Sequence, residues 1–253
     1  MAPTLKARGG GELTFFGISV YDGWFWSAVP GWPQTGPYAL DLHYHRSLDG
    51  AKIAERSVDE IEAFLATQLV DEMRHAVFFD RWASEVMALE SGSFRNRLEE
   101  IEERMLGPWH FLFDDSLREV ANRIKARPDD LELFVEGIVT YHMVTEGVLA
   151  MPGQRLILQY TEDHGLYPGF VKGFKLVEQD EHRHIAFGVR FLRDVCQERP
   201  EMKQVIVDKL CELLPEAAKV FVPPQEPDPS DYWSYDHHSS QVYGFAYQAL
   251  KRR

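Results

Sequence analysis

The sequence contains few cysteines and few basic residues, and it lacks a long apolar run. Only Cys196 and Cys211 are present, without a Cys-x-x-Cys spacing, which excludes a zinc ribbon and a disulfide scaffold. Lys and Arg number 27 against 40 Asp and Glu, so the net charge of −13 argues against a nucleic-acid partner. No run of about eighteen apolar residues is present, and residues 1–11 lack the apolar segment of a signal peptide. We therefore expect a cytoplasmic protein without a membrane span.

The pentapeptide Asp-Glu-x-Arg-His occurs twice, at residues 71–75 and 180–184, and it is the most informative feature of the sequence. In each copy a Glu and a His lie three residues apart, so both side chains project from the same face of a helix. Apolar residues flank both copies in alternating steps of three and four, which predicts two buried helix faces. A carboxylate in such a face must be protonated, paired or bound to metal. One shared metal site satisfies both copies.

A third carboxylate, Glu146, lies on another apolar helical stripe between the two copies. Dimetal carboxylate bundles take one Glu from each of two helices and a Glu-x-x-His pair from each of two others. Oxygen-rich ligation with two imidazoles favours iron or manganese over zinc. We therefore predict an all-α four-helix bundle around a dinuclear site, for which five ligands are identified: Glu72, His75, Glu146, Glu181 and His184.

The sixth ligand is marked less clearly. Asp41 is the first candidate, because a helix expected after Pro37 would carry it at a separation from Glu72 that suits an antiparallel helix pair. His43 or His45 on the same segment could take its place. The weaker carboxylate candidates are Glu12, Asp22, Glu55 and Glu60.

The residues around these ligands predict a second layer and a pocket. Asp71 and Asp180 fit hydrogen-bond partners for the outer nitrogens of the imidazoles, although ion pairs with Arg74 and Arg183 on a solvated face explain them as well. His142, one turn before Glu146, fits a core histidine at the pocket better than a ligand. The other expected pocket residues are aromatic: Phe78, Phe79 and Trp82.

Turn and capping signals divide one predicted domain, residues 1–253, into three parts. Residues 1–56 are rich in aromatics, Pro and Gly, so we expect irregular structure there apart from the helix after Pro37. Residues 57–222 form the predicted bundle core, which begins at a Ser57–Glu60 capping box. A break is predicted at residues 107–108, and a kink or a break at residues 152–153, after which residues 154–162 could continue the helix. Residues 223–253 are expected to form a connector and a short helix.

Three segments resemble the ligand-binding oxidases of the ribonucleotide reductase small-subunit superfamily: TYHMVTEGVLA at 140–150, DEHRHIAFG at 180–188 and CELLP at 211–215. The resemblance extends over roughly residues 57–222. The doubled pentapeptide is also similar to the hydroxylase subunits of bacterial multicomponent monooxygenases. The resemblance implies a ferritin-like bundle that holds an iron pair, or one manganese and one iron, and activates dioxygen.

The same resemblance implies a role for Tyr141. In the ligand-binding oxidases, a Tyr five residues before the third-helix Glu can crosslink to a Val near the first ligand, and Tyr141 occupies that position. A core tyrosine is the alternative. Ribonucleotide reductase small subunits usually carry a radical Tyr four residues after the first motif's His, where this chain has Phe79, so nucleotide reduction is disfavoured. Residues 1–56 also lack the long first helix of the oxidases.

These observations predict a dimetal oxygenase or oxidase that uses dioxygen and a small, largely apolar organic substrate. One alternative is a radical-generating subunit of a reductase, and another is a non-catalytic binder of a fatty-acid-like ligand with a structural metal. The acidic surface suits a basic redox donor protein. The apolar face of Leu210, Leu213 and Leu214 fits a homodimer and core packing equally well.

Overall fold

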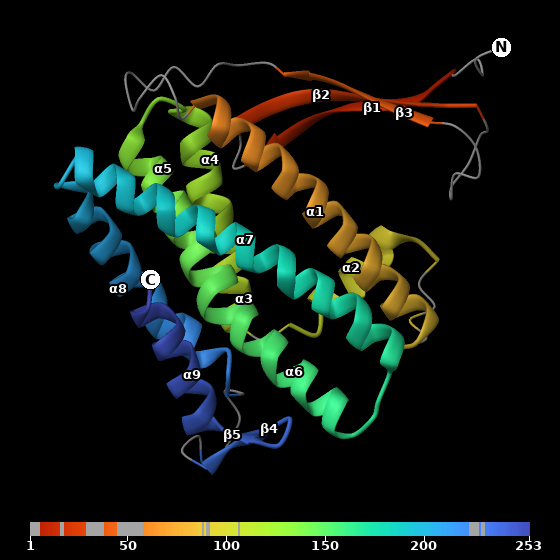
Figure 1. The fold of residues 1–253 in the computed structure, drawn as a ribbon, viewed down its shortest axis with the longest axis vertical. Helices are drawn as coiled ribbons and strands as arrows, with labels where there is room; N and C mark the ends of the chain where they lie inside the picture. Colours follow the sequence, from red (N-terminus) through yellow and green to blue (C-terminus); the bar gives the residue numbers. More distant parts are fainter. Residues whose placement is uncertain are drawn as a thin grey trace.

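The computed structural model describes residues 6–15, 18–28, 38–44, 58–87, 89, 92–105, 107–222, 228 and 231–253. Most of these residues lie in helices that pack as a bundle, with a small sheet at the top of the view in Figure 1. The two longest α-helices, α1 (Val58–Glu85) and α7 (Pro168–Glu198), pack against each other. The prediction of an all-α, ferritin-like bundle is confirmed.

A continuous helix from Leu131 to Asp163 forms the centre of the bundle. Its three sections are α5 (Leu131–Ile138), the π-helix η2 (Val139–Ala150) and α6 (Met151–Asp163). Helices α7, α8 (Met202–Lys219) and α9 (Ser239–Lys251) all pack against η2. By length and composition this helix could cross a membrane, but 72% of its most apolar window is buried inside the protein, as is typical of a core helix.

The π-helical section η2 brings residues five apart onto nearly the same face, because its hydrogen bonds close five residues back. The Met151 N–H donates to the Glu146 carbonyl, and Thr145 Oγ1 donates to the Thr140 carbonyl at 2.9 Å. In an α-helix, residues five apart would point about 140° away from each other. The π-helix therefore directs the side chains of Tyr141 and Glu146 toward the same side of the bundle.

The remaining helices cover the central helix. Buried apolar residues such as Val139, Ile185 and Val195 form a core where η2, α7 and α8 meet. A second cluster, around Val148 and Leu213, lies between η2, α8 and α9. The other helices are α2 (Phe94–Glu102), α3 (Gly107–His110), the π-helix η1 (Phe111–Leu117) and α4 (Arg118–Ala126), and β4 (Trp233–Ser234) and β5 (His237–His238) form a two-stranded sheet.

The ends of α6 agree only in part with the sequence prediction. Of the kink or break predicted at Pro152, a break is absent: the helix continues to Asp163, and the change from π to α geometry falls just before the proline. The predicted boundary before α7 is confirmed. Gly165 ends α6 with a left-handed φ of 62°, a conformation that costs glycine little, and Pro168 begins α7.

Three antiparallel strands lie where the sequence predicted irregular structure, in the order β1 (Lys6–Phe15), β2 (Ile18–Ser27) and β3 (Tyr38–Tyr44). The prediction of a helix after Pro37 is therefore wrong. Residues 38–44, YALDLHY, alternate large apolar residues with Ala, Asp and His, and this period of two is the pattern of a strand. Asp41 pairs with Trp24 of β2 in the sheet.

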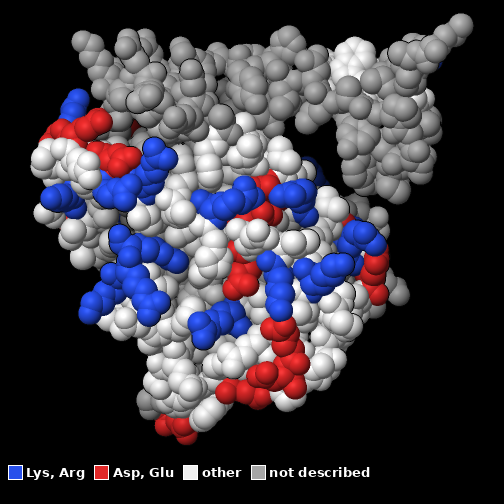
Figure 2. Space-filling view, viewed as in Figure 1, with Lys and Arg blue, Asp and Glu red and all other residues white. Residues whose placement is uncertain are grey.

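Several predicted residues are beyond what the structure describes. Ser57, His45 and Glu55 lie outside the described residues, as do the side chains of Glu12, Asp22, Asp41, His43 and Glu60. The described surface is of mixed charge despite the net charge of −13. On the face shown in Figure 2, Lys and Arg side chains are interspersed with Asp and Glu, and neither sign covers it continuously.

The close crossing of α7 and η2 predicts opposite effects for two Gly→Ala substitutions. A Cβ at Gly188 of α7 would meet His142 Cβ at 2.5 Å, so Gly188→Ala should lower the free energy of unfolding by about 1–3 kcal/mol through overpacking. A Cβ at Gly153 of α6 meets nothing within 4 Å, so Gly153→Ala should raise stability by about 0.5–1 kcal/mol. Denaturant unfolding of both variants checks this. Equal effects would mean that the helices are not in close contact at Gly188.

Candidate metal centre

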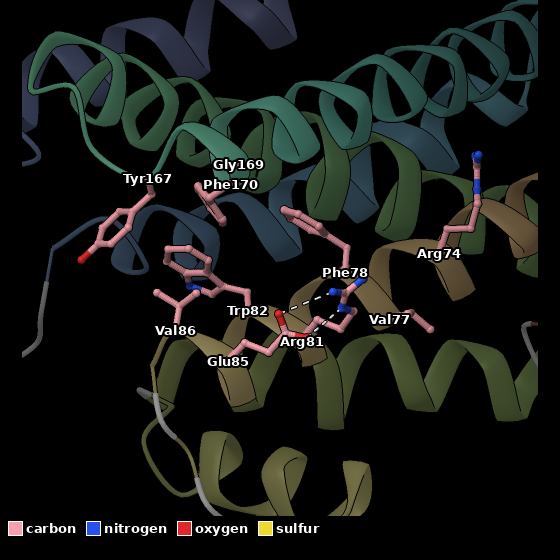
Figure 3. Close-up of a pocket in the computed structure, with 10 residues that line it drawn as sticks. All are labelled: Arg74, Val77, Phe78, Arg81, Trp82, Glu85, Val86, Tyr167, Gly169 and Phe170. Carbon is pink, nitrogen blue, oxygen red and sulfur yellow. Dashed lines mark hydrogen bonds and ion pairs between the residues drawn. The ribbon is translucent and has the colours of Figure 1, made fainter. Parts of the chain in front are cut away.

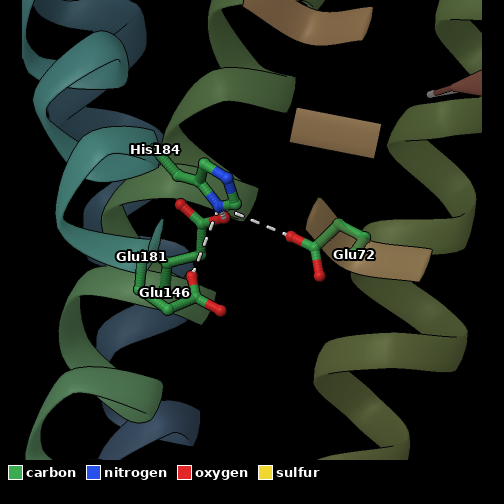
Figure 4. Close-up of side chains that lie close together, drawn as sticks. All are labelled: Glu72, Glu146, Glu181 and His184. Carbon is green, nitrogen blue, oxygen red and sulfur yellow. Dashed lines mark ion pairs between the residues drawn. The ribbon is translucent and has the colours of Figure 1, made fainter. Parts of the chain in front are cut away.

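Four side chains from three helices meet inside the bundle (Figure 4). Glu72 reaches across from α1 toward Glu146 of η2 and toward Glu181 and His184 of α7, and one ligand atom of each lies within 4.8 Å of the others. Glu146, Glu181 and His184 are 3%, 7% and 0% exposed. The Glu72 side chain is 29% exposed, so the group is most accessible beside Glu72.

His75 completes the set of five Glu and His side chains, which the structure brings together as the sequence predicted. Its Nδ1 lies 3.5 Å from Glu72 Oε2 and 3.5 Å from Glu181 Oε1. Nδ1 of His184 lies 3.3 Å from Glu146 Oε1 and 3.6 Å from Glu72 Oε1. Both imidazoles therefore direct the same nitrogen, Nδ1, toward the carboxylates.

The opposite nitrogen of each imidazole contacts an Asp on the other helix. His75 Nε2 of α1 lies 3.2 Å from Asp180 Oδ2 of α7, and His184 Nε2 of α7 lies 3.2 Å from Asp71 Oδ2 of α1. Each carboxylate can accept the Nε2 proton, so that Nδ1 has a lone pair for a ligand bond once the ring is neutral. The sequence predicted a bond between each Asp and an imidazole but could not specify that the partners are exchanged between the two motifs.

Arg74 and Arg183 cover these aspartates from the solvent side. Each guanidinium donates to both carboxylates: Arg74 Nη2 lies 3.1 Å from Asp180 Oδ2, Arg183 Nη2 lies 3.0 Å from Asp71 Oδ2, and each Arg also contacts the Asp of its own helix. Burial by itself would raise the pKa of Asp180, but Arg183 and His75 outweigh it and lower that pKa. The structure thus contains both arrangements that the sequence left open, the Asp–His contacts and the Asp–Arg pairs.

Three buried atoms at the centre make no hydrogen bond: Glu146 Oε2, Glu181 Oε2 and His184 Nδ1. Buried polar atoms are rarely left without a partner, and here the three belong to side chains that converge on one place. Carboxylate oxygens and imidazole nitrogens are the donors that iron and manganese take in such bundles. The residues therefore fit a dinuclear metal site.

The protonation of the centre reflects the crowding of its carboxylates. Burial raises the pKa of Glu146 to about 8. Burial alone would lower the pKa of His184, but Glu146 and Glu181 raise it to about 10. Burial likewise opposes ionisation of Glu72, but contacts with His75 and Tyr141 outweigh it and lower its pKa. The metal-free centre therefore retains protons that bound metal ions would displace.

Tyr141 lies against one of these carboxylates. Its hydroxyl donates to Glu72 Oε1 at 2.6 Å, and burial together with the charges of Glu146 and Glu72 raises its pKa well above 10. Tyr141 thus keeps its phenolic proton. The Val to which the resemblance would link it is not identified in the described part of the chain.

Two buried residues beside the centre, Gln68 and His142, form a chain of hydrogen bonds to Glu146. His142 Nε2 lies 3.0 Å from Gln68 Oε1, and Gln68 Nε2 donates to Glu146 Oε1 at 3.0 Å. The sequence placed His142 as a core histidine and gave Gln68 no role. The available signal was that Gln68, one turn before Glu72, interrupts an otherwise apolar helix face.

A pocket of about 570 Å³ lies between the second half of α1 and the start of α7 (Figure 3). Phe78 and Trp82, two of the predicted pocket residues, line it together with Tyr167 and Phe170, and the Trp82 and Phe170 rings lie 4.4 Å apart. Arg74 also lines the pocket, whereas none of the five Glu and His side chains does. The pocket is therefore not lined by the metal centre, and Arg74 is the residue of the Arg and Asp layer that borders it.

Two other predicted pocket residues, Phe79 and His142, are not among those that line it. Phe79 packs edge-on against Phe174, with ring centroids 5.6 Å apart, and His142 is fully buried. Asp41 lies on β3 and its side chain is not described, so its role as the sixth ligand stays a prediction.

The helices form a ferritin-like bundle, and the Glu and His cluster inside it could hold metal. No family model and no curated protein matches the sequence. Among solved structures, the chain is similar to a Tyr-to-Phe variant of an R2-like ligand-binding oxidase with an aerobically reconstituted Mn/Fe cofactor. The TM-score is 0.63 at 24% identity, over 77% of this chain and 68% of the other.

Two further solved structures of R2-like ligand-binding oxidases give the same result. A Val-to-Ala variant with an anaerobically reconstituted Mn/Fe cofactor matches with a TM-score of 0.63 at 24% identity, over 77% of this chain and 68% of the other. A Gly-to-Leu variant with a non-activated Mn/Mn cofactor matches with a TM-score of 0.62 at 22% identity, over 77% and 66%. The chain therefore has the fold of the R2-like ligand-binding oxidases, as the resemblance implied.

Exchanging an aspartate for asparagine should test the second layer. Asp71→Asn weakens the acceptor for His184 Nε2. The affinity of this variant for Mn(II), measured by anaerobic calorimetric titration, should therefore fall roughly 10–100-fold. Asp180→Asn should have a similar effect through His75, whereas Asp194→Asn, half-exposed on the same helix, should have none. Unchanged affinity in both variants would contradict a role for these aspartates in orienting the imidazoles.

The metal-free protein should lose stability as pH rises from about 4.5. Unfolded Glu146 ionises near its ordinary pKa of 4.5 but folded Glu146 only near 8, and His184 is raised from 6.5 to about 10. In both cases the folded state binds more protons between the two values, so stability is highest below the unfolded pKa and falls up to the folded one. Denaturant unfolding from pH 4.5 to 8 should show a smaller fall in the free energy of unfolding for Glu146→Gln, because a glutamine at this position cannot ionise.

The exposed Glu198→Gln serves as the control for this measurement and should keep the parent's pH dependence. If Glu146→Gln instead retained the full fall between pH 4.5 and 8, the buried carboxyl of Glu146 would not be the group that titrates.

Proposed function

We propose that this protein is a dioxygen-activating dimetal oxidase or oxygenase that acts on a small, largely apolar organic substrate. The observation that carries the proposal is the convergence of three carboxylates and two imidazoles, three of whose buried atoms have no hydrogen-bond partner. The similarity in fold to oxidases with Mn/Fe cofactors supports one manganese and one iron, or two irons, as the cofactor. When bound, these metals supply the redox chemistry that activates dioxygen.

In this proposal Glu72, His75, Glu146, Glu181 and His184 hold the metals. Asp71 and Asp180, backed by Arg74 and Arg183, keep each imidazole in the tautomer with a free Nδ1. Asp41 remains the proposed sixth ligand.

Tyr141 holds a proton on its hydroxyl beside Glu72 Oε1. Because Glu72 is the most exposed of the carboxylates, substrate and dioxygen would approach the centre on its side. Tyr141 is therefore the proposed catalytic residue at that entrance, and it supplies a hydrogen-bond donor where Glu72 would otherwise be open to water.

A second candidate function, non-catalytic binding of a fatty-acid-like ligand, is favoured by the position of the pocket. The pocket is lined by Phe78, Trp82, Tyr167 and Phe170 but by none of the proposed metal ligands. An apolar ligand there would not touch the centre. A radical-generating reductase subunit has less support, because the position of the radical tyrosine is taken by Phe79.

A cytoplasmic location, a basic redox donor protein and a homodimer remain part of the proposal. The net charge of −13 supports a basic donor. Against the homodimer, Leu213 is fully buried within the chain, so it serves the core and not an interface.

The proposal is tested by metal content and reaction with oxygen. Protein loaded anaerobically with Fe(II) and Mn(II) should contain about two metals per chain by elemental analysis. Exposure to dioxygen should consume oxygen and change the near-ultraviolet and visible absorption. Glu181→Gln should lose metal and oxygen consumption, because it removes one charged ligand, whereas the exposed Glu198→Gln should keep both.

Full metal loading and oxygen consumption in Glu181→Gln would reject the assignment of this centre. Two bound metals without any oxygen consumption would favour the second candidate, a ligand-binding protein with a structural metal site.

A further inference from the structure

Gln68 and His142 are two fully buried polar side chains that contact the metal centre without belonging to its proposed ligands. Gln68 lies on α1 and His142 on η2, so their hydrogen bond joins two helices of the bundle. Burying an amide and an imidazole is costly unless both are hydrogen-bonded in a defined way. Their hydrogen bonds end at one oxygen of Glu146, which suggests a role at that carboxylate.

The direction of these hydrogen bonds is determined by the chemistry of the three groups. When Glu146 is ionised, as a metal ligand must be, its oxygens only accept, so Gln68 presents its NH₂ group to Glu146 Oε1 and its carbonyl oxygen faces His142 Nε2. That oxygen can only accept, so Nε2 of His142 carries the proton and donates. Burial, together with the nearby His184, lowers the pKa of His142 to about 3, which keeps the ring neutral. His142 therefore prevents the Gln68 amide from turning its oxygen toward Glu146.

The two oxygens of Glu146 are consequently not equivalent. Oε1 accepts from Gln68 at 3.0 Å and lies 3.3 Å from His184 Nδ1, whereas Oε2 is buried and has no hydrogen-bond partner. A hydrogen bond to one oxygen of a carboxylate fixes the rotation of the group and leaves the other oxygen for a ligand. Close packing also holds His142 in place, since Gly188 leaves its Cβ just enough room.

We propose that Gln68, oriented by His142, is a positioning residue that holds Glu146 through Oε1 and so reserves Oε2 for the metal. This inference rests on the proposed function, because it assumes that Glu146 is a metal ligand. Gln68 is a polar residue on the buried face of α1 that lies outside the Asp-Glu-x-Arg-His motif, and the proposal gives it a role.

The test compares two buried glutamines. Gln68→Met keeps the length and approximate shape of the side chain but removes both amide groups. Gln154→Met makes the same change on α6, where the glutamine is also buried, at 6% exposure, and is not among the residues that meet at the centre. The probe is Mn(II) alone, titrated anaerobically into metal-free protein by calorimetry. Gln68→Met should lower the affinity roughly 10–100-fold, and Gln154→Met should leave it unchanged.

The thermal unfolding midpoint of each metal-free variant separates positioning from simple stabilisation. A purely structural glutamine would lower the midpoint on replacement without changing the affinity for Mn(II). A second pair of variants applies even if Gln68→Met fails to fold. His142→Phe removes the donor to Gln68 and should weaken Mn(II) binding, whereas His142→Gln supplies another N–H donor and should restore it.

The outcomes distinguish this inference from the proposed function. Mn(II) binding at wild-type affinity in both Gln68→Met and His142→Phe would overturn the positioning role and leave the metal centre intact. A wild-type protein that binds neither Mn(II) nor Fe(II) would overturn the proposed function, and this inference with it.

Discussion

The convergence of three carboxylates inside the bundle is the constraint on which the other features of this structure depend. Glu72, Glu146 and Glu181 come from three different helices and lie among apolar side chains, where uncompensated negative charge is strongly unfavourable. Without metal, the structure compensates with protons, which are retained on Glu146 and on His184. Two divalent cations would displace those protons and neutralise the three carboxylates, so metal binding and the stability of the fold are linked.

The exchange of partners between α1 and α7 explains how such a centre keeps its geometry. Each helix supplies an imidazole and also the aspartate that orients the other helix's imidazole. A shift of one helix along the other would therefore disturb both imidazoles together. The duplicated pentapeptide thus has two functions in each copy: Glu and His face the centre, while Asp and Arg link the two helices.

Residues 1–56 are the part of the chain whose structure differs most from what the sequence predicted. The density of Pro, Gly and aromatics there obscured a period of two over residues 38–44, and β3 occupies the segment where a helix with Asp41 was expected. Strand pairing depends on partners elsewhere in the chain, so a short alternating segment is a weak local signal. The π-helix before Pro152 was not predicted either, because a π-helix is not evident from the periodicity of apolar residues.

The sequence by itself determined the bundle and the five Glu and His residues of the centre, because polar residues on an apolar helical face must meet others of their kind in the interior. Tertiary structure decided which atoms meet. The exchanged Asp–His contacts depend on how α1 and α7 cross. The joint presentation of Tyr141 and Glu146 depends on η2 being a π-helix, and the role of Gln68 depends on a residue of another helix, His142. None of these relations is encoded in the spacing of residues along one helix.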